Sequence, residues 1–372
     1  MKNLLRRLGI LINSRYSFSS PKESKILFFD LQSEELINNY FKKKDYEILY
    51  IRGENLNLNI ILNMILKLKF SFKDYIYTYI KKVNPKVVIT FIDNSIFFYS
   101  LKKDFSDIKF ISVQYGYRRQ ILDWFPKLRK LNGKKNYLSA DYIFTFGKSV
   151  SLEYSKYIKS KNIEIGSFKN NLVSISPGQS KNKKLLFISQ FRTSHINSPD
   201  FYCTERILLP LLHKFCETKN INLNILGTRS GNDSITEKNY FSKILKKNKF
   251  NFIKKKSFMS YQLVDLYDMI VFIDSTLGYE AIARNKKVAV FSTRRSDYED
   301  KQGSPFGWPK LINENGFFYT NILSKDEVYR VLNNVFNCSQ INWKKKTKKI
   351  LNGIIDYNSK NKKFFEVVNK II

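Results

Sequence analysis

Short apolar runs alternate along most of the chain with segments of mixed polarity that are long enough to form helices. In the first half these runs lie at residues 26–31, 47–52, 87–92, 109–114, 141–146 and, in a shorter form, 163–167. Strands that are buried on both faces of a parallel sheet have this nearly continuous apolar character, and helices supply the crossovers between them. The pattern therefore predicts an α/β protein with parallel sheets.

The alternation stops once and then resumes. Residues 169–184 collect Asn, Ser, Pro, Gly and Lys, which is typical of a linker. Further apolar runs follow at 185–191, 223–226, 252–255, 269–273, 287–291 and 317–319. In a chain of 372 residues this indicates two successive α/β domains. We predict a basic segment at 1–22, a first domain at 23–170, a linker at 171–184, a second domain at 185–345 and a C-terminal helix at 346–372.

The chain carries a formal net charge of +33, and 51 of its 65 basic residues are Lys. Proteins dedicated to nucleic acid rely on the Arg fork for bases and phosphates, so nucleic acid is the partner that this composition favours least. Two sources of the charge stay open: the codon bias of an AT-rich genome, and an anionic membrane surface or ligand.

The three cysteines, Cys203, Cys216 and Cys338, lie far apart, which predicts neither a disulfide framework nor a zinc site and fits a reducing cytoplasm. No apolar stretch reaches the roughly 18 residues of a membrane span. The longest candidate, residues 56–70, is interrupted by Asn and Lys and predicts an amphipathic helix. We therefore expect a cytoplasmic protein that attaches peripherally to the anionic inner face of the membrane.

Several familiar chemistries have no motif in this sequence. There is no GxGxxG dinucleotide fingerprint, no GxSxG nucleophile elbow and no DxD pair that would hold a divalent metal on a sugar nucleotide. The two histidines, His195 and His213, are too few for a histidine metal cluster. We predict no metal site.

The most informative segment is residues 269–292, MIVFIDSTLGYEAIARNKKVAVFS. It predicts a buried strand, a tight turn, a short helix and a second buried strand. Ser275, Thr276 and Gly278 fall at the helix N-terminus, where free N–H groups and the helix dipole attract phosphate. Glu280 follows one turn later, at the sheet edge where open α/β folds bind ligands, and suits the hydroxyls of a ribose. The alternative is that Ser275 or Thr276 caps the helix and Glu280 complements its dipole.

This segment resembles the donor site of GT-B glycosyltransferases. More narrowly, several segments resemble a family of bacterial surface carbohydrate biosynthesis proteins found with O-antigen and capsule genes. They are VVITFIDNSIFFYSL (87–101), KFISVQYGYRRQ (109–120), ADYIFTFGKS (140–149), IEIGSFKNN (163–171), LLFISQFR (185–192) and STLGYEAIARNKKVAVFS (275–292). The resemblance implies two Rossmann-like domains facing across a cleft, with the nucleotide held by the second. It also implies a transferase acting on a lipid-linked or nucleotide-linked glycan.

In a GT-B arrangement the carboxyl edge of the first sheet faces the cleft. Asp93 follows a buried strand there and could be the general base that deprotonates the acceptor hydroxyl, although Asp-Asn-Ser also forms an ordinary turn. Gln114, Gly116 and Arg118 follow the next strand, and we expect them to bind the acceptor. Gly116 can bring its backbone close to a ligand, and Arg118 suits an anionic acceptor unless this is simply a solvated basic turn.

The first strand of the second domain ends in Ser189, Gln190 and Arg192. We expect Ser189 and Gln190 to contact the donor and Arg192 to offset the charge of the leaving phosphate, with a surface ion pair as the alternative for Arg192. Gly227 stands at the end of the next strand, and we expect it to contact the donor as well.

These residues predict a metal-independent GT-B glycosyltransferase of surface polysaccharide assembly. It would use a nucleotide-sugar as co-substrate, no resident cofactor, and a lipid-linked or other glycan as acceptor. One rival is a sugar-nucleotide 2-epimerase of the same fold, which needs several carboxylates and a histidine in the cleft. The other is a protein without enzymatic activity that binds polysaccharide or membrane.

Overall fold

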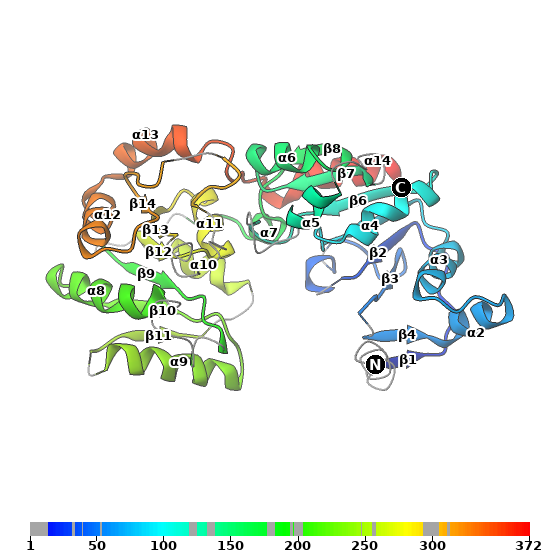
Figure 1. Ribbon diagram of the computed structural model, residues 1–372, viewed down its shortest axis with the longest axis horizontal. Coiled ribbons are helices and arrows are strands. Elements are labelled where there is room, and N and C mark those ends of the chain that lie inside the picture. Colours follow the sequence, from blue (N-terminus) through cyan, green and yellow to red (C-terminus); the bar gives the residue numbers. More distant parts are fainter. Residues whose placement is uncertain are drawn as a thin grey trace.

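The computed structural model of the protein describes residues 14–31, 34–38, 40–52, 54–118, 125–131, 138–176, 183–193, 196, 204–246, 248–254, 258–292, 305–310 and 313–372. Two six-stranded sheets, each entirely parallel, lie side by side along the long axis of the molecule (Figure 1). The prediction of two successive α/β domains with parallel sheets is confirmed.

The first sheet has the strand order β3-β2-β5-β6-β7-β8. Its strands are β2 (Ile26–Phe29), β3 (Tyr46–Leu49), β5 (Val87–Thr90), β6 (Lys109–Val113), β7 (Ser139–Thr145) and β8 (Lys159–Glu164). The helices of this domain are α3 (Phe72–Val83), α4 (Ile96–Leu101), α5 (Phe125–Lys130), α6 (Lys148–Ser155) and α7 (Phe168–Leu172), with short 3-10 turns at η1 (Glu34–Leu36) and η2 (Lys102–Asp104). Every residue of β2 and β5 is buried, as their apolar sequences predict.

The second sheet has the strand order β11-β10-β9-β12-β13-β14. Its strands are β9 (Leu185–Ile188), β10 (Leu223–Leu226), β11 (Asn251–Ile253), β12 (Met269–Phe272), β13 (Lys287–Phe291) and β14 (Tyr319–Thr320). They alternate with α8 (Thr204–Thr218), α9 (Asn232–Leu245), α10 (Met259–Asp265) and α11 (Thr276–Ala283), and α12 (Lys325–Asn337) and α13 (Gln340–Leu351) follow. The order reverses between β9 and β12, which is where open α/β sheets bind ligands.

Two elements of the first domain differ from the sequence prediction. Strand β8 covers 159–164 instead of 163–167, because it lies at the edge of the sheet and its polar sequence KSKNIE carries no buried apolar run. The helix predicted over 56–70 is shorter. The chain first forms β4 (Asn55–Asn57), which pairs with β1 (Arg15–Ser17), and α2 then covers Leu58–Leu66 with Asn57 as its N-cap.

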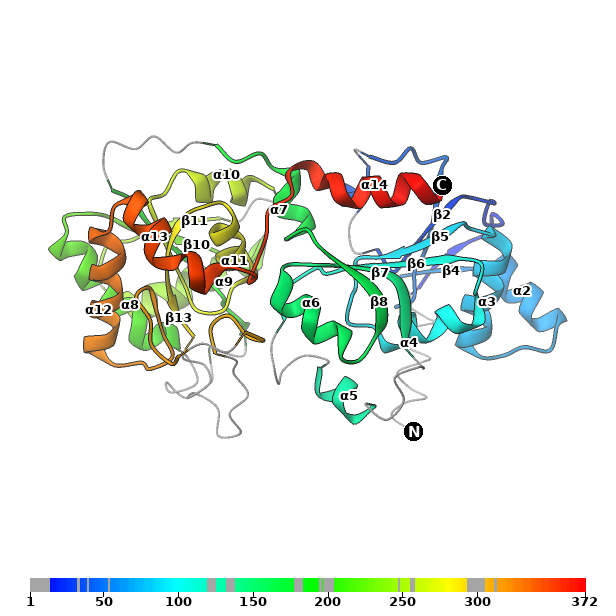
Figure 2. The ribbon, with the colours of Figure 1, turned by 90° about the horizontal axis from the view of Figure 1, so that it is seen from above.

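The C-terminal segment crosses back to the first domain. After α13 the chain turns, passes η7 (Ser359–Asn361) and ends in α14 (Lys362–Ile371), so the predicted C-terminal helix is in fact two helices. Figure 2 shows α14 lying over the first domain. Its Phe364 packs against Phe91, Phe144 and Phe168, with ring centroids 5.1–6.4 Å apart. None of the helices described here is long and apolar enough to cross a bilayer.

A buried arginine joins the two domains. Arg284, directly after α11, forms a fully buried ion pair with Asp265 of α10. It also donates to the Asn170 side chain of α7 and to the backbone carbonyls of Val173 and Ser174, each at 2.9 Å. Since α7 belongs to the first domain and residues 173–174 directly follow it, this one guanidinium fixes the end of the first domain against the second.

We expect Arg284→Met to lower the free energy of unfolding by about 3–5 kcal/mol, because it leaves the Asp265 carboxylate buried without its charged partner. The matched control is Arg330→Met, which breaks a partly exposed pair with Glu327 and is expected to cost about 0–1 kcal/mol. Urea unfolding followed by circular dichroism measures both. Equal losses in the two variants would contradict the role given to Arg284.

Candidate functional site

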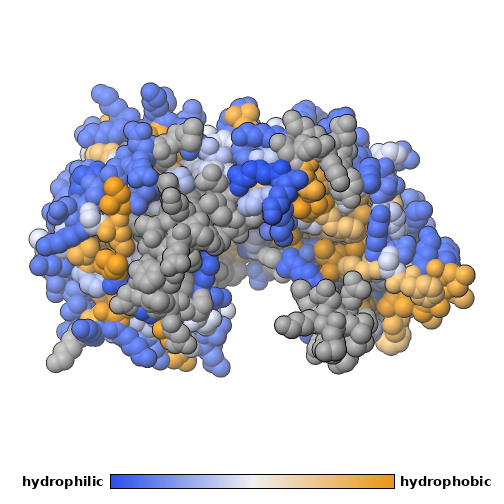
Figure 3. All heavy atoms as spheres, viewed as in Figure 1, coloured by the Kyte–Doolittle hydropathy of each residue, from blue (hydrophilic) through white to orange (hydrophobic). Residues whose placement is uncertain are grey.

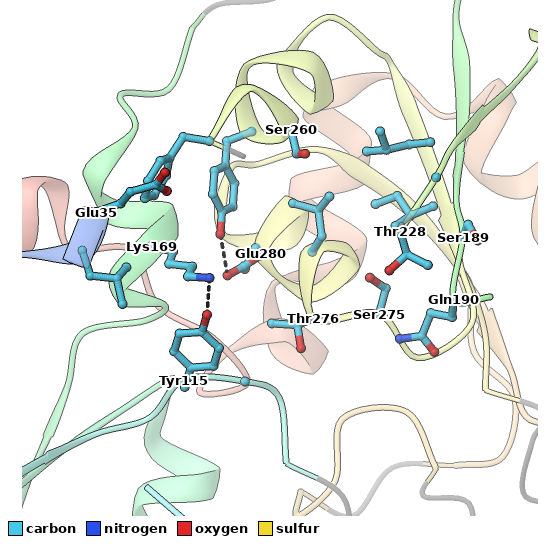
Figure 4. A pocket seen from close by; sticks show the side chains of 18 residues that line it. Glu35, Tyr115, Lys169, Ser189, Gln190, Thr228, Ser260, Ser275, Thr276 and Glu280 are labelled. Atoms are coloured by element: carbon cyan, nitrogen blue, oxygen red, sulfur yellow. Dashed lines mark hydrogen bonds between the residues drawn. The ribbon is translucent and has the colours of Figure 1, made fainter. Parts of the chain in front are cut away.

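A cavity of about 430 Å³ lies between the two domains (Figure 4). The first domain contributes η1, the residues after β6 and one residue of α7. The second contributes the residues after β9 and β10 and the first turns of α10 and α11. Because this is the carboxyl edge of the second sheet, next to the strands at which its order reverses, we take the cavity as the candidate site.

Helix α11 opens its N-terminus into the cavity. Ser275 is the N-cap, but its side chain makes no capping hydrogen bond, and Ser275, Thr276 and Leu277 all line the cavity. The Thr276 hydroxyl oxygen accepts instead from the backbone N–H of Tyr117 of the first domain, at 3.2 Å. The first N–H groups of α11 therefore remain available, and with the helix dipole they favour an anion. This geometry supports the predicted phosphate site over the capping alternative.

Two of the three predicted glycines lie at the cavity. Gly227 and Gly116 line the cavity, as expected. Gly278 does not: a Cβ there would lie 2.2 Å from the ring of Phe272. The expectation that Gly278 admits a ligand is therefore wrong, because the residue serves the packing of α11 on β12.

Glu280 lines the cavity although it is only 3% exposed. Its Oε1 accepts from the hydroxyls of Ser167 in the first domain and Tyr261 on α10, the latter at 3.1 Å. Both bonds go to one oxygen, which leaves Oε2 for a ligand. Burial raises the pKa of Glu280 to about 7, although these hydrogen bonds and the charge of Lys169 lower it.

Lys169 on α7 supplies a positive charge to this cavity. Its ammonium lies 4.3 Å from the centre of the Tyr115 ring and donates to the Tyr115 hydroxyl, as Figure 4 shows. The sequence did not identify Lys169 as a site residue, because Lys169 is the first residue of the segment 169–184, whose composition is typical of a linker. Its place in the family-like stretch IEIGSFKNN was the signal that could have identified it.

Ser189 and Gln190 line the cavity. A buried carboxylate fixes the backbone and side chains on this side of it. Glu237 of α9 is fully buried and accepts from the Ser189 hydroxyl and from the backbone N–H groups of Thr228 and Arg229, the latter two at 2.9–3.0 Å. Sequence reasoning missed Glu237. An acidic residue on the apolar face of a helix was the available signal.

Two buried polar atoms in the wall have no hydrogen-bond partner within the described structure. They are the Gln190 side-chain oxygen and the Ser260 hydroxyl. Buried polar groups are normally paired, so unpaired ones that line a cavity are typical of a site that awaits a polar ligand. Glu35 of η1 also lines the cavity from the first domain and was not predicted.

Asp93 does not have the place expected of a general base. Its carboxylate is 0% exposed and is surrounded by donors: the Tyr115 N–H at 3.0 Å, the Arg118 Nε at 2.7 Å and the Tyr154 hydroxyl. A base with both oxygens occupied in the interior cannot reach an acceptor hydroxyl. The pair also accounts for Arg118, whose guanidinium is held by the Asp93 carboxylate. The predicted role of Asp93 as a general base is wrong.

Two further predicted residues lie outside the cavity. Gln114 is buried and bridges two strand ends, donating to the Gly116 carbonyl at 2.9 Å and accepting from the Phe146 N–H at 2.8 Å. Arg192 follows β9 but does not line the cavity, whereas Lys169 does. His213 lies on α8, near the Lys249 carbonyl at 3.1 Å and away from the cavity.

The raised pKa of Glu280 makes stability depend on pH. Between the unfolded value of 4.5 and the folded value of about 7, the folded protein binds more protons than the unfolded chain, so its stability falls as the pH rises. Glu280→Gln removes this titration. We expect its stability relative to the parent to rise by on the order of 3 kcal/mol from pH 4.5 to pH 7. Urea unfolding of both proteins at several pH values measures this, and a constant difference would contradict the assignment.

The sequence model of one protein family matches residues 111–372, and the family is described as a "putative O-antigen biosynthesis protein". No protein with a curated description matches the chain. Among solved structures, the wall teichoic acid polymerase TagF is similar, with a TM-score of 0.54, 12% identity, and coverage of 99% of this chain and 93% of TagF.

Two other similar structures contain a nucleotide. Alr3699/HepE of Anabaena, in complex with UDP and glucose, has a TM-score of 0.54 and 10% identity, and covers 93% of this chain and 100% of its own. MnaA of S. aureus, in a co-structure with UDP, has a TM-score of 0.52 and 15% identity, with coverage of 94% and 98%. These likenesses show the GT-B fold that the sequence predicted. Since the family match spans most of the sequence, the chain belongs to this family of O-antigen biosynthesis proteins.

Proposed function

We propose that the protein is a glycosyltransferase that moves a sugar from a nucleotide-sugar donor to a glycan acceptor in the assembly of a bacterial surface polysaccharide. One observation carries the proposal. The uncapped N-terminus of α11 opens into a cavity between two Rossmann-like domains, and the Lys169 ammonium lies in the same cavity. The cavity volume of about 430 Å³ is in the usual range for a small-molecule site.

The chemistry of the wall supports a definite arrangement of the donor. The phosphates would lie on the first N–H groups of α11 and near Lys169, since both favour negative charge. The free Oε2 of Glu280 would accept from the ribose hydroxyls. Gln190 and Ser260, whose buried polar atoms lack partners, would bind the base or the sugar. The UDP named in the HepE and MnaA structures makes a uridine nucleotide the first candidate.

The proposed reaction requires no covalent bond between the substrate and the protein. The acceptor hydroxyl oxygen bonds to the anomeric carbon as its proton passes to water. The bond from that carbon to the donor phosphate breaks, and its electron pair leaves with the nucleotide. Negative charge grows on that phosphate, where the α11 N–H groups and Lys169 would stabilise it. We propose that these groups suffice without a divalent metal or a resident cofactor. Orientation in the cleft supplies the rest.

Nucleotide binding tests the site. At a concentration 100 times its Kd, the correct nucleotide adds about 2.7 kcal/mol of stability, which raises Tm by several degrees. In a panel of UDP, CDP, GDP, CMP and free sugars, we expect one nucleotide to do so and the sugars not to. Glu280→Gln should weaken that binding about tenfold, because an interaction with a charged acceptor is lost. The control Glu327→Gln, on α12, should bind normally.

The outcome also separates the rival functions. If no nucleotide stabilises the protein, a binding protein without enzymatic activity replaces the proposal. If a bound sugar nucleotide is altered without any acceptor, a sugar-nucleotide epimerase replaces it.

Transfer itself depends on Lys169 in this proposal. We expect Lys169→Met to lower the single-turnover rate about 10²–10³-fold, because the group that offsets the charge of the leaving phosphate is gone. Arg192→Met, outside the cavity, is the control and should turn over within a few-fold of the parent. The parent rate should survive EDTA. A rate abolished by the chelator and restored by Mg²⁺ or Mn²⁺ would show that the charge is carried by a metal instead.

A further inference from the structure

A cluster of exposed apolar side chains covers α2 and the turn that follows it. We call this cluster the apolar tip. It comprises Leu62, Ile65, Leu66, Leu68, Phe70 and Phe72, each 49–85% exposed. Figure 3 shows the corresponding hydrophobic surface at the end of the first domain that is remote from the second. Phe18, 75% exposed, lies beside it, since the Asn59 side chain donates to the Phe18 carbonyl.

The tip is not a packing face of the fold. Helix α2 buries Ile60 and Met64 against the domain, half-buries Leu58 and Ile61, and leaves Leu62, Ile65 and Leu66 exposed. Leu66 and Leu68, at 85% and 81%, are among the most exposed large apolar residues of the described structure. Exposed apolar surface gathered in one place is uncommon on soluble monomers and marks a surface that binds something.

The conformation of Leu68 supports this reading. Its φ is +52°, in the left-handed region, at the turn that ends α2. Gly or Asn usually fills such a position, because a side chain there costs about 1–2 kcal/mol. Leu68 bears this cost without gaining any burial in the fold.

The charge of the residues around the apolar tip indicates what the tip binds. From Leu66 onward the apolar residues alternate with Lys67, Lys69 and Lys73, all exposed, and residues 62–73 contain no acidic side chain. The nearest one, Asp74, is held by the Ser71 backbone and hydroxyl. Lys is depleted at protein–protein interfaces, whereas apolar side chains mixed with Lys suit the interface of a bilayer with anionic lipids.

We propose that the apolar tip inserts into the headgroup region of an anionic bilayer and attaches the first domain to the membrane surface. The apolar side chains enter the boundary with the acyl chains, and the three lysines contact the lipid phosphates. A glycan acceptor carried on a lipid would then be presented to the domain that bears the tip. The attachment itself does not depend on the proposed transferase activity.

Sedimentation with vesicles tests the tip on the full chain. We expect the parent to bind vesicles of phosphatidylcholine with phosphatidylglycerol at least tenfold more tightly than pure phosphatidylcholine, and high salt to reduce the binding. The triple variant Leu66→Ser, Leu68→Ser, Phe70→Ser should lose at least tenfold in affinity. The matched control is Leu152→Ser, Ile235→Ser, Ile341→Ser, which removes three equally apolar exposed residues elsewhere and should bind as the parent does.

A second readout is independent of affinity. The fluorescence added by Phe70→Trp should be quenched by brominated lipid if the tip enters the bilayer. Absence of quenching, or equal binding by the two triple variants, would overturn the proposal. So would binding that is equal on neutral and anionic vesicles. If the parent is a dimer in analytical ultracentrifugation and only the tip variant is a monomer, with vesicle binding unchanged, a second copy of the chain is the occupant instead.

Discussion

The buried pair of Arg284 and Asp265 is the interaction on which the geometry of the cleft depends. Arg284 also donates hydrogen bonds to the Asn170 side chain and to two backbone carbonyls at the end of the first domain. The cavity is built from both domains, so its shape exists only while this junction holds. The contact of Tyr117 with Thr276 and its stacking on Tyr279 extend the same junction along α11. A fully buried charge pair is a poor source of net stability but a strict geometric constraint.

Three buried carboxylates lie near the cleft. Their hydrogen bonds determine whether each one only holds the structure together or can also bind a ligand. Asp93 and Glu237 have both oxygens occupied by hydrogen-bond donors, so each organises a loop and offers nothing to a ligand. Glu280 receives its two bonds on a single oxygen and borders the cavity. This difference follows from desolvation, because a buried carboxylate must receive hydrogen bonds or a counter-charge. Only an oxygen that has no such partner within the protein is available to a ligand.

The sequence predicts most of the fold because a buried parallel strand is visible as a short apolar run in the sequence itself. At 223–226 and 287–291 the predicted bounds are those observed. It fails at β8, an edge strand whose partner covers one side only. At the site, the α11 turn was predictable because one segment contains both its strand and its helix. Asp93, Arg118 and Lys169 were not, since their side chains bond to residues that are 22 to 61 positions away in the chain. Which of several polar residues at a strand end points into a cleft is decided by tertiary packing.

The return of α14 has a consequence for the order in which the protein can be assembled. Phe364 and Val368 belong to the core of the first domain, although they follow the whole second domain in the chain. A nascent first domain must therefore wait with one face of its sheet incompletely covered while the whole second domain is synthesised. The two domains are thus a single unit in biogenesis, and a chain cut short between α13 and α14 would leave the earlier domain unfinished.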